Sequence, residues 1–289
     1  MNGPPDGDGD RRGRGPGEPE ASAGSLLLTL LGEFVLPGGR AVWTSTFTEA
    51  LAALDIEEKA ARQALARSAG RGLLRSEKIG RRVRWELTDS ARRLLEDGTE
   101  RIYRFGLATP PWDGRWLLLF CSLPEARREL RYRLRVRLGW VGLGPFGPGA
   151  WLSPWAEREA AAVATLTELA LRDDARTFIG GLGTLGDARD IAAQAWPLDG
   201  LAERYRRFLV DHGPDGAGPD DGDRDAFIRV TNLVHRWRQF PGEDPGLPAE
   251  LLPAGWPGSA AAAAFHARHR GWSAAARRWW DGLEAADRS

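Results

Sequence analysis

Basic side chains are concentrated in one short stretch of this chain. Between residues 59 and 84 there are nine Lys or Arg and a single acidic residue, Glu77. Arginine can donate two parallel hydrogen bonds to the edge of guanine, and glutamine can pair in the same way with adenine. Lysine and arginine also neutralise phosphates. The stretch, which includes Gln63, therefore carries the side chains needed to bind DNA.

Two patterns within the stretch indicate how these side chains are positioned. Ala61 and Leu65 recur at helical spacing, whereas Val83, Trp85 and Leu87 alternate with polar residues as in a half-buried strand. The first pattern predicts a helix that buries one side and exposes its basic side. The second predicts a hairpin formed by residues 73–79 and 81–87.

The residues before the stretch predict a second helix. Thr46 and Glu49 have capping-box spacing, and the apolar residues that follow predict a helix over residues 47–54. Asp55 and Ile56 then form a tight turn into the basic helix, and Gly80 lies at the tip of the hairpin. A helix, a turn, a basic helix and a hairpin in this order predict a winged helix-turn-helix.

In such a domain the basic helix meets base edges in the major groove and the hairpin holds phosphates. The predicted DNA-binding residues are Lys59, Arg62, Gln63, Arg67, Lys78, Arg81 and Arg82. A solvated basic face is the alternative interpretation, since winged helices also serve as protein-interaction modules.

The remaining elements predict an α+β multidomain chain. The order strand, helix, strand, strand, helix, strand between residues 116 and 182 is typical of a ferredoxin-like sandwich, whose first strand is expected to be buried on both faces. We divide the chain into a flexible tail (1–24), a winged-helix domain (25–104) closed by a helix ending at Gly98, a ferredoxin-like domain (105–188) and a C-terminal helical domain (189–289).

Composition and motifs argue against several other classes. The chain has 40 basic and 40 acidic residues, and its one cysteine, Cys121, excludes an internal disulfide or a cysteine metal cluster. His266 and His269 have the spacing of two metal ligands, but two ligands do not make a site, and we expect surface histidines. We therefore predict no enzyme, no catalytic or metal site and no cofactor. An apolar stretch long enough for a membrane span or signal peptide is missing, so a cytoplasmic protein is expected.

Four stretches resemble the PaaX family of transcriptional regulators, whose founding members repress genes of phenylacetate catabolism. They are residues 26–39 (LLLTLLGEFVLPGG), 59–74 (KAARQALARSAGRGLL), 111–154 and 233–258. The resemblance implies a winged-helix domain, a middle domain related to a small CRISPR adaptation nuclease, and a C-terminal helical domain. It also implies a dimer that leaves DNA when it binds an aryl-CoA thioester.

The chain departs from the family at three positions of the DNA-binding domain. Glu57 stands where a capping Ser is common, Ser68 where Leu is usual, and Leu73 where Trp is common. These departures leave the fold intact and bear on the operator sequence.

The expected function is that of a transcriptional regulator, a homodimeric repressor that binds a pseudo-palindromic operator in double-stranded DNA. An acyl- or aryl-CoA effector, held between the middle and C-terminal domains, would release it. The alternatives are a metal-dependent nuclease derived from the middle domain and a winged-helix interaction module without a DNA target. The nuclease alternative is disfavoured, because metal-dependent cleavage needs an Asp at the end of the first strand. Cys121 and Ser122 stand there instead. The sequence does not define the effector-binding residues, the operator, the regulated genes or the sign of regulation.

Overall fold

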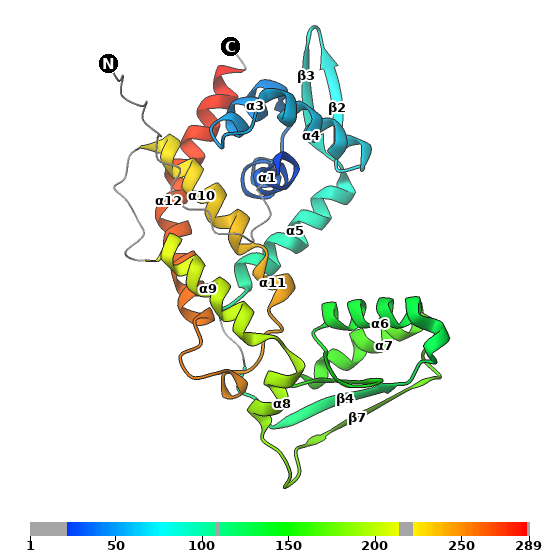
Figure 1. Cartoon of the computed structure of the whole chain (residues 1–289). Helices are drawn as coiled ribbons and strands as arrows, with labels where there is room; N and C mark the ends of the chain where they lie inside the picture. Colours follow the sequence, from blue (N-terminus) through cyan, green and yellow to red (C-terminus); the bar gives the residue numbers. More distant parts are fainter. Residues whose placement is uncertain (1–21, 108–109, 214–221, 288–289) are drawn as a thin grey trace, which may run out of the picture.

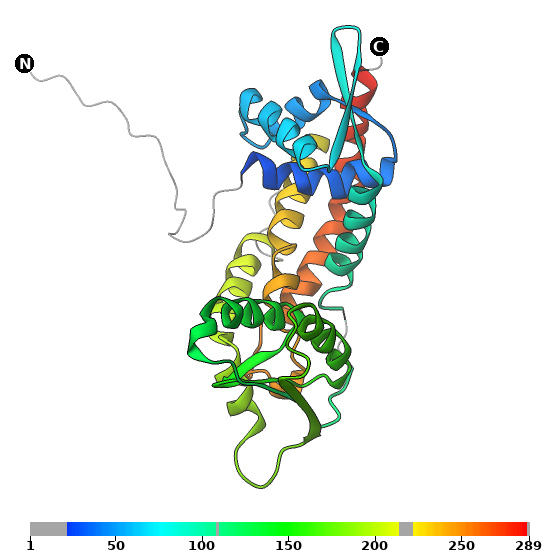
Figure 2. The same ribbon diagram turned by 90° about the vertical axis from the view of Figure 1, so that its right-hand side faces the viewer.

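The computed structural model describes residues 22–107, 110–213 and 222–287. The molecule is elongated, with a hairpin-bearing N-terminal part at one end and a sheet covered by two helices at the other (Figure 1, Figure 2). C-terminal helices connect the two ends. Most of the predicted tail (1–24) lies outside the described residues.

The N-terminal part consists of helices and one small antiparallel sheet. Its elements are α1 (Ala23–Leu30), the π-helical η1 (Leu31–Val35), α2 (Leu36–Gly38), β1 (Val42–Trp43), α3 (Thr44–Ala52), α4 (Glu58–Gly70), β2 (Leu74–Ile79), β3 (Arg82–Leu87) and α5 (Asp89–Arg104). The strand order is β1-β3-β2, and both pairs are antiparallel. The predicted hairpin is confirmed to within one residue at each strand.

Two predicted helix ends in this part are wrong. Helix α3 begins at Thr44, two residues before the predicted cap Thr46, whose hydroxyl instead donates to Asp287 at 2.5 Å. Helix α5 continues through Gly98 to Arg104. Its last turn is held by tertiary contacts, because Trp237 donates its indole N–H to the Ile102 carbonyl at 3.2 Å. At its start, Thr88 is the N-cap of α5 and accepts a hydrogen bond from the Ala91 amide.

The middle part is a four-stranded antiparallel sheet with helices on one face. It comprises β4 (Arg115–Cys121), the 3-10 turn η2 (Glu125–Arg127), α6 (Arg128–Val141), β5 (Gly144–Gly147), β6 (Ala150–Ser153), the 3-10 turn η3 (Ala156–Arg158), α7 (Glu159–Glu168) and β7 (Ala175–Gly181). The strand order is β5-β6-β4-β7. This confirms the predicted order of elements. Strand β4 is not buried on both faces throughout, because Phe120 is 43% exposed beside Phe178.

Helices make up most of the C-terminal part. They are α8 (Ala188–Ala195), α9 (Leu198–His212), α10 (Asp223–Trp237), α11 (Phe240–Glu243), the 3-10 turn η5 (Ala249–Leu251) and α12 (Gly258–Ala286). Helices α10 and α12 pack along each other and continue into the N-terminal part (Figure 1). None of the helices in the described ranges is both long and apolar enough to cross a membrane.

One hydrophobic core spans the N-terminal and C-terminal parts. Phe34 of η1 stacks on Trp280 of α12 with ring centres 5.2 Å apart and lies 5.1 Å from Phe227 of α10. Helices α6 and α7 cover a separate core on the sheet that includes Leu119 and Leu134. The predicted segments 25–104 and 189–289 therefore share their packing.

Candidate nucleic-acid interface

Helix α4 presents one apolar side and one basic side. Ala61, Ala64 and Leu65 are buried against the N-terminal core, as the 3.6-residue period requires. The predicted DNA-contacting residues of this helix are all exposed, namely Lys59, Arg62, Gln63 and Arg67. The structure therefore brings these four residues together on the outer face of one helix.

The start of α4 is set by a turn with an unusual backbone. Asp55 has a φ of 61°, a left-handed conformation that Asp tolerates better than most residues. Glu57 is the N-cap but makes no side-chain hydrogen bond to the helix. Glu58 pairs with Arg62 one turn later at 2.7 Å. An acidic residue thus holds one of the predicted base-contacting arginines.

The β2–β3 hairpin is neutral along its length and basic at its tip. Cross-strand pairs join Arg84 to Glu77 at 2.8 Å and Arg75 to Glu86 at 3.3 Å. At the tip, Gly80 adopts a φ of 61°, and Lys78 and Arg81 are exposed. Within the described part of the chain, neither of these two side chains forms an ion pair. The positive charge of the hairpin is therefore concentrated where it extends furthest.

Two hydrogen bonds fix the hairpin to α3. The Trp85 indole donates to Thr44 Oγ1 at 2.9 Å, and the Thr44 hydroxyl donates to the Val83 carbonyl at 2.9 Å. Helix α4 runs directly into β2 and contacts it. Helix α3 packs against both α4 and β3, so the basic helix and the hairpin are held against the same helix.

Arg82 differs from the other predicted site residues. Its guanidinium pairs with Asp287, just past the end of α12, at 2.7 Å and lies 4.2 Å from the ring centre of Trp43. The sequence interpretation missed Glu58, Trp43 and Asp287. The four-residue spacing of Glu58 and Arg62 was a usable signal. No sequence pattern indicated Asp287 as a partner of Arg82, since 205 residues separate the two.

The candidate metal and nuclease positions have other roles. His269 is not a surface histidine as predicted, because its Nε2 lies 2.8 Å from Glu33 and 3.0 Å from the Tyr103 hydroxyl. Burial beside Glu33 raises the pKa of Tyr103. No group of three metal-ligating side chains occurs in residues 22–107, 110–213 or 222–287. Cys121 is buried at the end of β4, and burial raises the pKa of its thiol.

A small cavity lies in the C-terminal part, between the start of α9 and the end of α11. It has a volume of about 400 Å³ and is lined by residues that include Trp196, Leu198, Arg204, Arg207 and Pro245. Arg204 is already paired with Glu243. Arg207 is exposed at the rim. The cavity combines apolar walls with the charged side chains of Arg204, Arg207 and Glu243.

An exposed basic helix joined to a hairpin with a basic tip defines a surface suited to a polyanion. Comparison with known protein families shows which family the chain belongs to. Residues 22–91 match the family model described as PaaX-like protein, residues 109–192 the PaaX protein central Cas2-like domain, and residues 196–282 the PaaX-like protein C-terminal domain. Together these models cover most of the chain, and the chain belongs to the PaaX family.

Individual relatives agree with this assignment. The transcriptional repressor PaaX of Escherichia coli (strain K12) is 28% identical over 249 residues, which span 83% of this chain and 77% of that protein. Among solved structures, the uncharacterized protein Rv0674 from Mycobacterium tuberculosis is similar with a TM-score of 0.61 and 24% identity. That similarity covers 91% of this chain and 99% of the other. It shows a shared fold.

Proposed function

We propose that this chain, a DNA-binding transcriptional repressor of the PaaX family, holds its operator with a winged helix-turn-helix formed by α3, α4 and the β2–β3 hairpin. The observation that carries the proposal is the exposed face of α4, where Lys59, Gln63 and Arg67 lie together. The core-facing side of the same helix is fully apolar. A helix anchored in this way can enter a major groove without rearranging.

The two basic elements have different roles in this proposal. Gln63 and Arg67 meet base edges, while Lys78 and Arg81 hold phosphates from the hairpin tip. Arg62 joins the base-reading group once it leaves Glu58, and Lys59 lies beside the backbone at the groove entrance. Arg82 reaches a phosphate from the side of the hairpin.

The experiment that separates these roles compares Arg67→Ala with Arg81→Ala. The operator is first defined by selection from a random DNA library, and affinities are then measured by fluorescence anisotropy. Arg67→Ala should cost about 1–3 kcal/mol on the operator and relax sequence preference at one position. Arg81→Ala should weaken operator and random duplex about equally. The control is Arg206→Ala, an exposed arginine of α9. Loss of binding in this control, or unchanged binding in both test variants, contradicts the proposal.

We also propose that two copies bind a pseudo-palindromic operator. The reason is geometric, because two identical recognition helices related by a two-fold axis read inverted half-sites about one or two helical turns apart. Light scattering with and without operator duplex measures the stoichiometry. Enrichment of a single, non-repeated site would contradict the dimer.

An acyl- or aryl-CoA effector is the last part of the proposal. The cavity beside Trp196 supports a thioester site, since its apolar wall suits an acyl group and Arg207 at its edge suits a phosphate. A panel of CoA thioesters and free CoA, tested by thermal shift, should raise the unfolding temperature of the wild type. Arg207→Ala should abolish that rise, whereas Arg206→Ala should keep it.

A further inference from the structure

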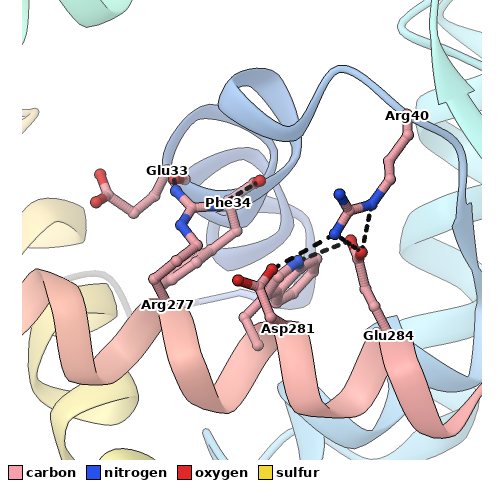
Figure 3. A network of polar contacts seen from close by, with 7 residues as sticks. Glu33, Phe34, Arg40, Arg277, Asp281 and Glu284 are labelled. Atoms are coloured by element: carbon pink, nitrogen blue, oxygen red, sulfur yellow. Dashed lines mark hydrogen bonds and ion pairs between the residues drawn. The ribbon is translucent and has the colours of Figure 1, made fainter.

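Helix α12 connects the C-terminal part to the DNA-binding hairpin. It is 29 residues long, and it ends beside the β2–β3 hairpin in Figure 2 and beside α3 in Figure 1. Near this end Arg277 donates to the Phe34 carbonyl at 2.7 Å and also to the Glu33 carbonyl (Figure 3). Both carbonyls belong to the π-helical η1, where the helical hydrogen-bond pattern changes. These bonds fix α12 to the first helical segment of the chain.

A second set of contacts lies closer to the end of α12. The buried Glu284 accepts a hydrogen bond from Arg40 Nε at 2.6 Å and from the Trp280 indole at 2.9 Å. Asp281 lies 3.5 Å from the same arginine, as Figure 3 shows. The end of α12 therefore has a defined position relative to the loop that leads into β1.

Asp287 follows α12 directly and makes three polar contacts. Its carboxylate accepts from Ser45 Oγ at 2.5 Å, from Thr46 Oγ1 at 2.5 Å and from the Arg82 guanidinium at 2.7 Å. Ser45 and Thr46 lie in the first turn of α3, where the helix dipole stabilises a negative charge. The side chain of Asp287 is only 15% exposed. One carboxylate thus joins α12, α3 and the hairpin.

The guanidinium of Arg82 is fixed on one side and open on another. It stacks over Trp43 and pairs with Asp287, yet 46% of its side chain remains exposed. An arginine has five N–H donors in a rigid fork, so the pair with Asp287 leaves donors for a second acceptor. Arg82 directly follows Arg81 at the hairpin tip. Its free edge is therefore available to the polyanion that the tip would meet.

We propose that Asp287 is a positioning residue for DNA binding, which orients Arg82 so that the free edge of the guanidinium meets a DNA phosphate. The proposal rests on the proposed function. A long side chain loses rotamer entropy when it is ordered on binding, and Asp287 and Trp43 order it beforehand. Because Asp287 is carried by α12, the position of that helix sets the position of the phosphate contact.

The test uses the full chain, the selected operator and a random duplex, with anisotropy measured over a series of salt concentrations. Asp287→Asn should weaken binding to both duplexes by about fivefold, in line with the loss of a partly exposed ion pair. Arg82→Ala should weaken both and reduce the salt slope by about one. Since the two residues act as one unit, the double variant should bind no more weakly than Arg82→Ala.

Asp281→Asn is the matched control, because it removes the same charge from the same helix without touching Arg82. It should bind DNA as the wild type does or slightly more tightly. Arg82→Lys keeps the charge but loses the fork held between Trp43 and Asp287, so its affinity should fall about as far as that of Asp287→Asn, with a smaller change of the salt slope than in Arg82→Ala. Circular dichroism at the assay temperature verifies that each variant is folded.

The proposal is overturned if Asp287→Asn binds DNA as tightly as Asp281→Asn, or if Asp287→Asn and Arg82→Ala weaken binding additively. It is also overturned if Arg82→Lys binds as the wild type does. Unchanged affinity in Lys78→Ala and Arg81→Ala would contradict the proposed function itself, and that result is separable from the behaviour of Asp287.

Discussion

Trp237 packs where three helices of different parts of the chain meet. It is fully buried, and its ring stacks on Phe265 with the ring centres 4.8 Å apart. Its indole N–H donates a hydrogen bond to the Ile102 carbonyl near the end of α5. Trp237→Ala should lower the free energy of unfolding by about 3–5 kcal/mol, because removing the ring leaves a cavity and an unpaired carbonyl. Urea denaturation measures the change. Trp140→Ala, at a position 67% exposed on α6, is the control and should cost less than about 0.5 kcal/mol.

His235 provides a pH-dependent test of the shared core. Its Nδ1 lies 3.2 Å from the Thr29 hydroxyl, and burial lowers its pKa to about 4. The unfolded chain binds this proton near pH 6.5, so between these values the unfolded state holds more protons and stability falls as pH falls. His212, whose pKa burial also lowers to about 4, adds to the same trend.

The measurement for this prediction is urea denaturation at pH 7 and pH 5. The loss of stability between the two should be smaller in His235→Gln than in the wild type, since glutamine does not titrate. An equal loss in both proteins would mean that His235 gains its proton equally in the folded and unfolded states, and would contradict a lowered pKa.

The turn after α5 lies against α12 and has little space. Gly106 has a φ of 75°, and a Cβ there would come within 2.6 Å of the Ala262 Cβ. Gly72 has a nearly equal φ of 73° but faces open space. Both Ala variants pay the left-handed strain of about 1–2 kcal/mol. Gly106→Ala should lose about 1–3 kcal/mol more through overpacking. Equal unfolding midpoints for Gly106→Ala and Gly72→Ala would show that the turn can move away from α12 at little cost in stability.

Elements defined by local signals could be predicted from the sequence. Gly80 and the alternation of Val83, Trp85 and Leu87 placed the hairpin correctly, and Ala61 and Leu65 identified the buried side of α4. Helix ends that depend on contacts with distant parts of the chain could not be predicted from the sequence. The last turns of α5 depend on α10 and α12, and Thr46 turns away from a capping role because Asp287 accepts its hydroxyl.

The candidate site divides in the same way. Composition and spacing were sufficient to select the exposed basic residues of α4 and the hairpin tip. The ion-pair partner of Arg82 could not be predicted, because no pattern in the sequence relates position 82 to position 287. The same holds for the cavity beside Trp196, whose walls come from α9, from the two residues before it and from the end of α11.

At the scale of the whole molecule, the N-terminal part depends on the C-terminal helices for its packing. Phe34, Phe227 and Trp280 belong to one core, so a fragment of residues 22–107 would expose a large apolar surface. We expect this fragment to lack a cooperative thermal transition in calorimetry. Joining residues 222–287 to it through a flexible linker should restore cooperative unfolding. A fragment that unfolds cooperatively alone would contradict the shared core.

If the proposed effector binds, this arrangement would connect it physically to the proposed DNA-binding elements. A ligand at the cavity beside Trp196 would touch α9, which packs on α12, and α12 ends at the hairpin. An effector changes DNA affinity only by its differential affinity for the two positions of such an element.

The central claim, that α4 and the hairpin bind a specific operator, is tested most directly by the salt dependence of the wild-type protein. Affinity is measured for the selected operator and for random duplex between 50 and about 200 mM salt. The account predicts a steep loss of affinity with salt on both duplexes and an operator preference of at least about 10³-fold. Equal affinity for the two duplexes, or binding that does not change with salt, would contradict it.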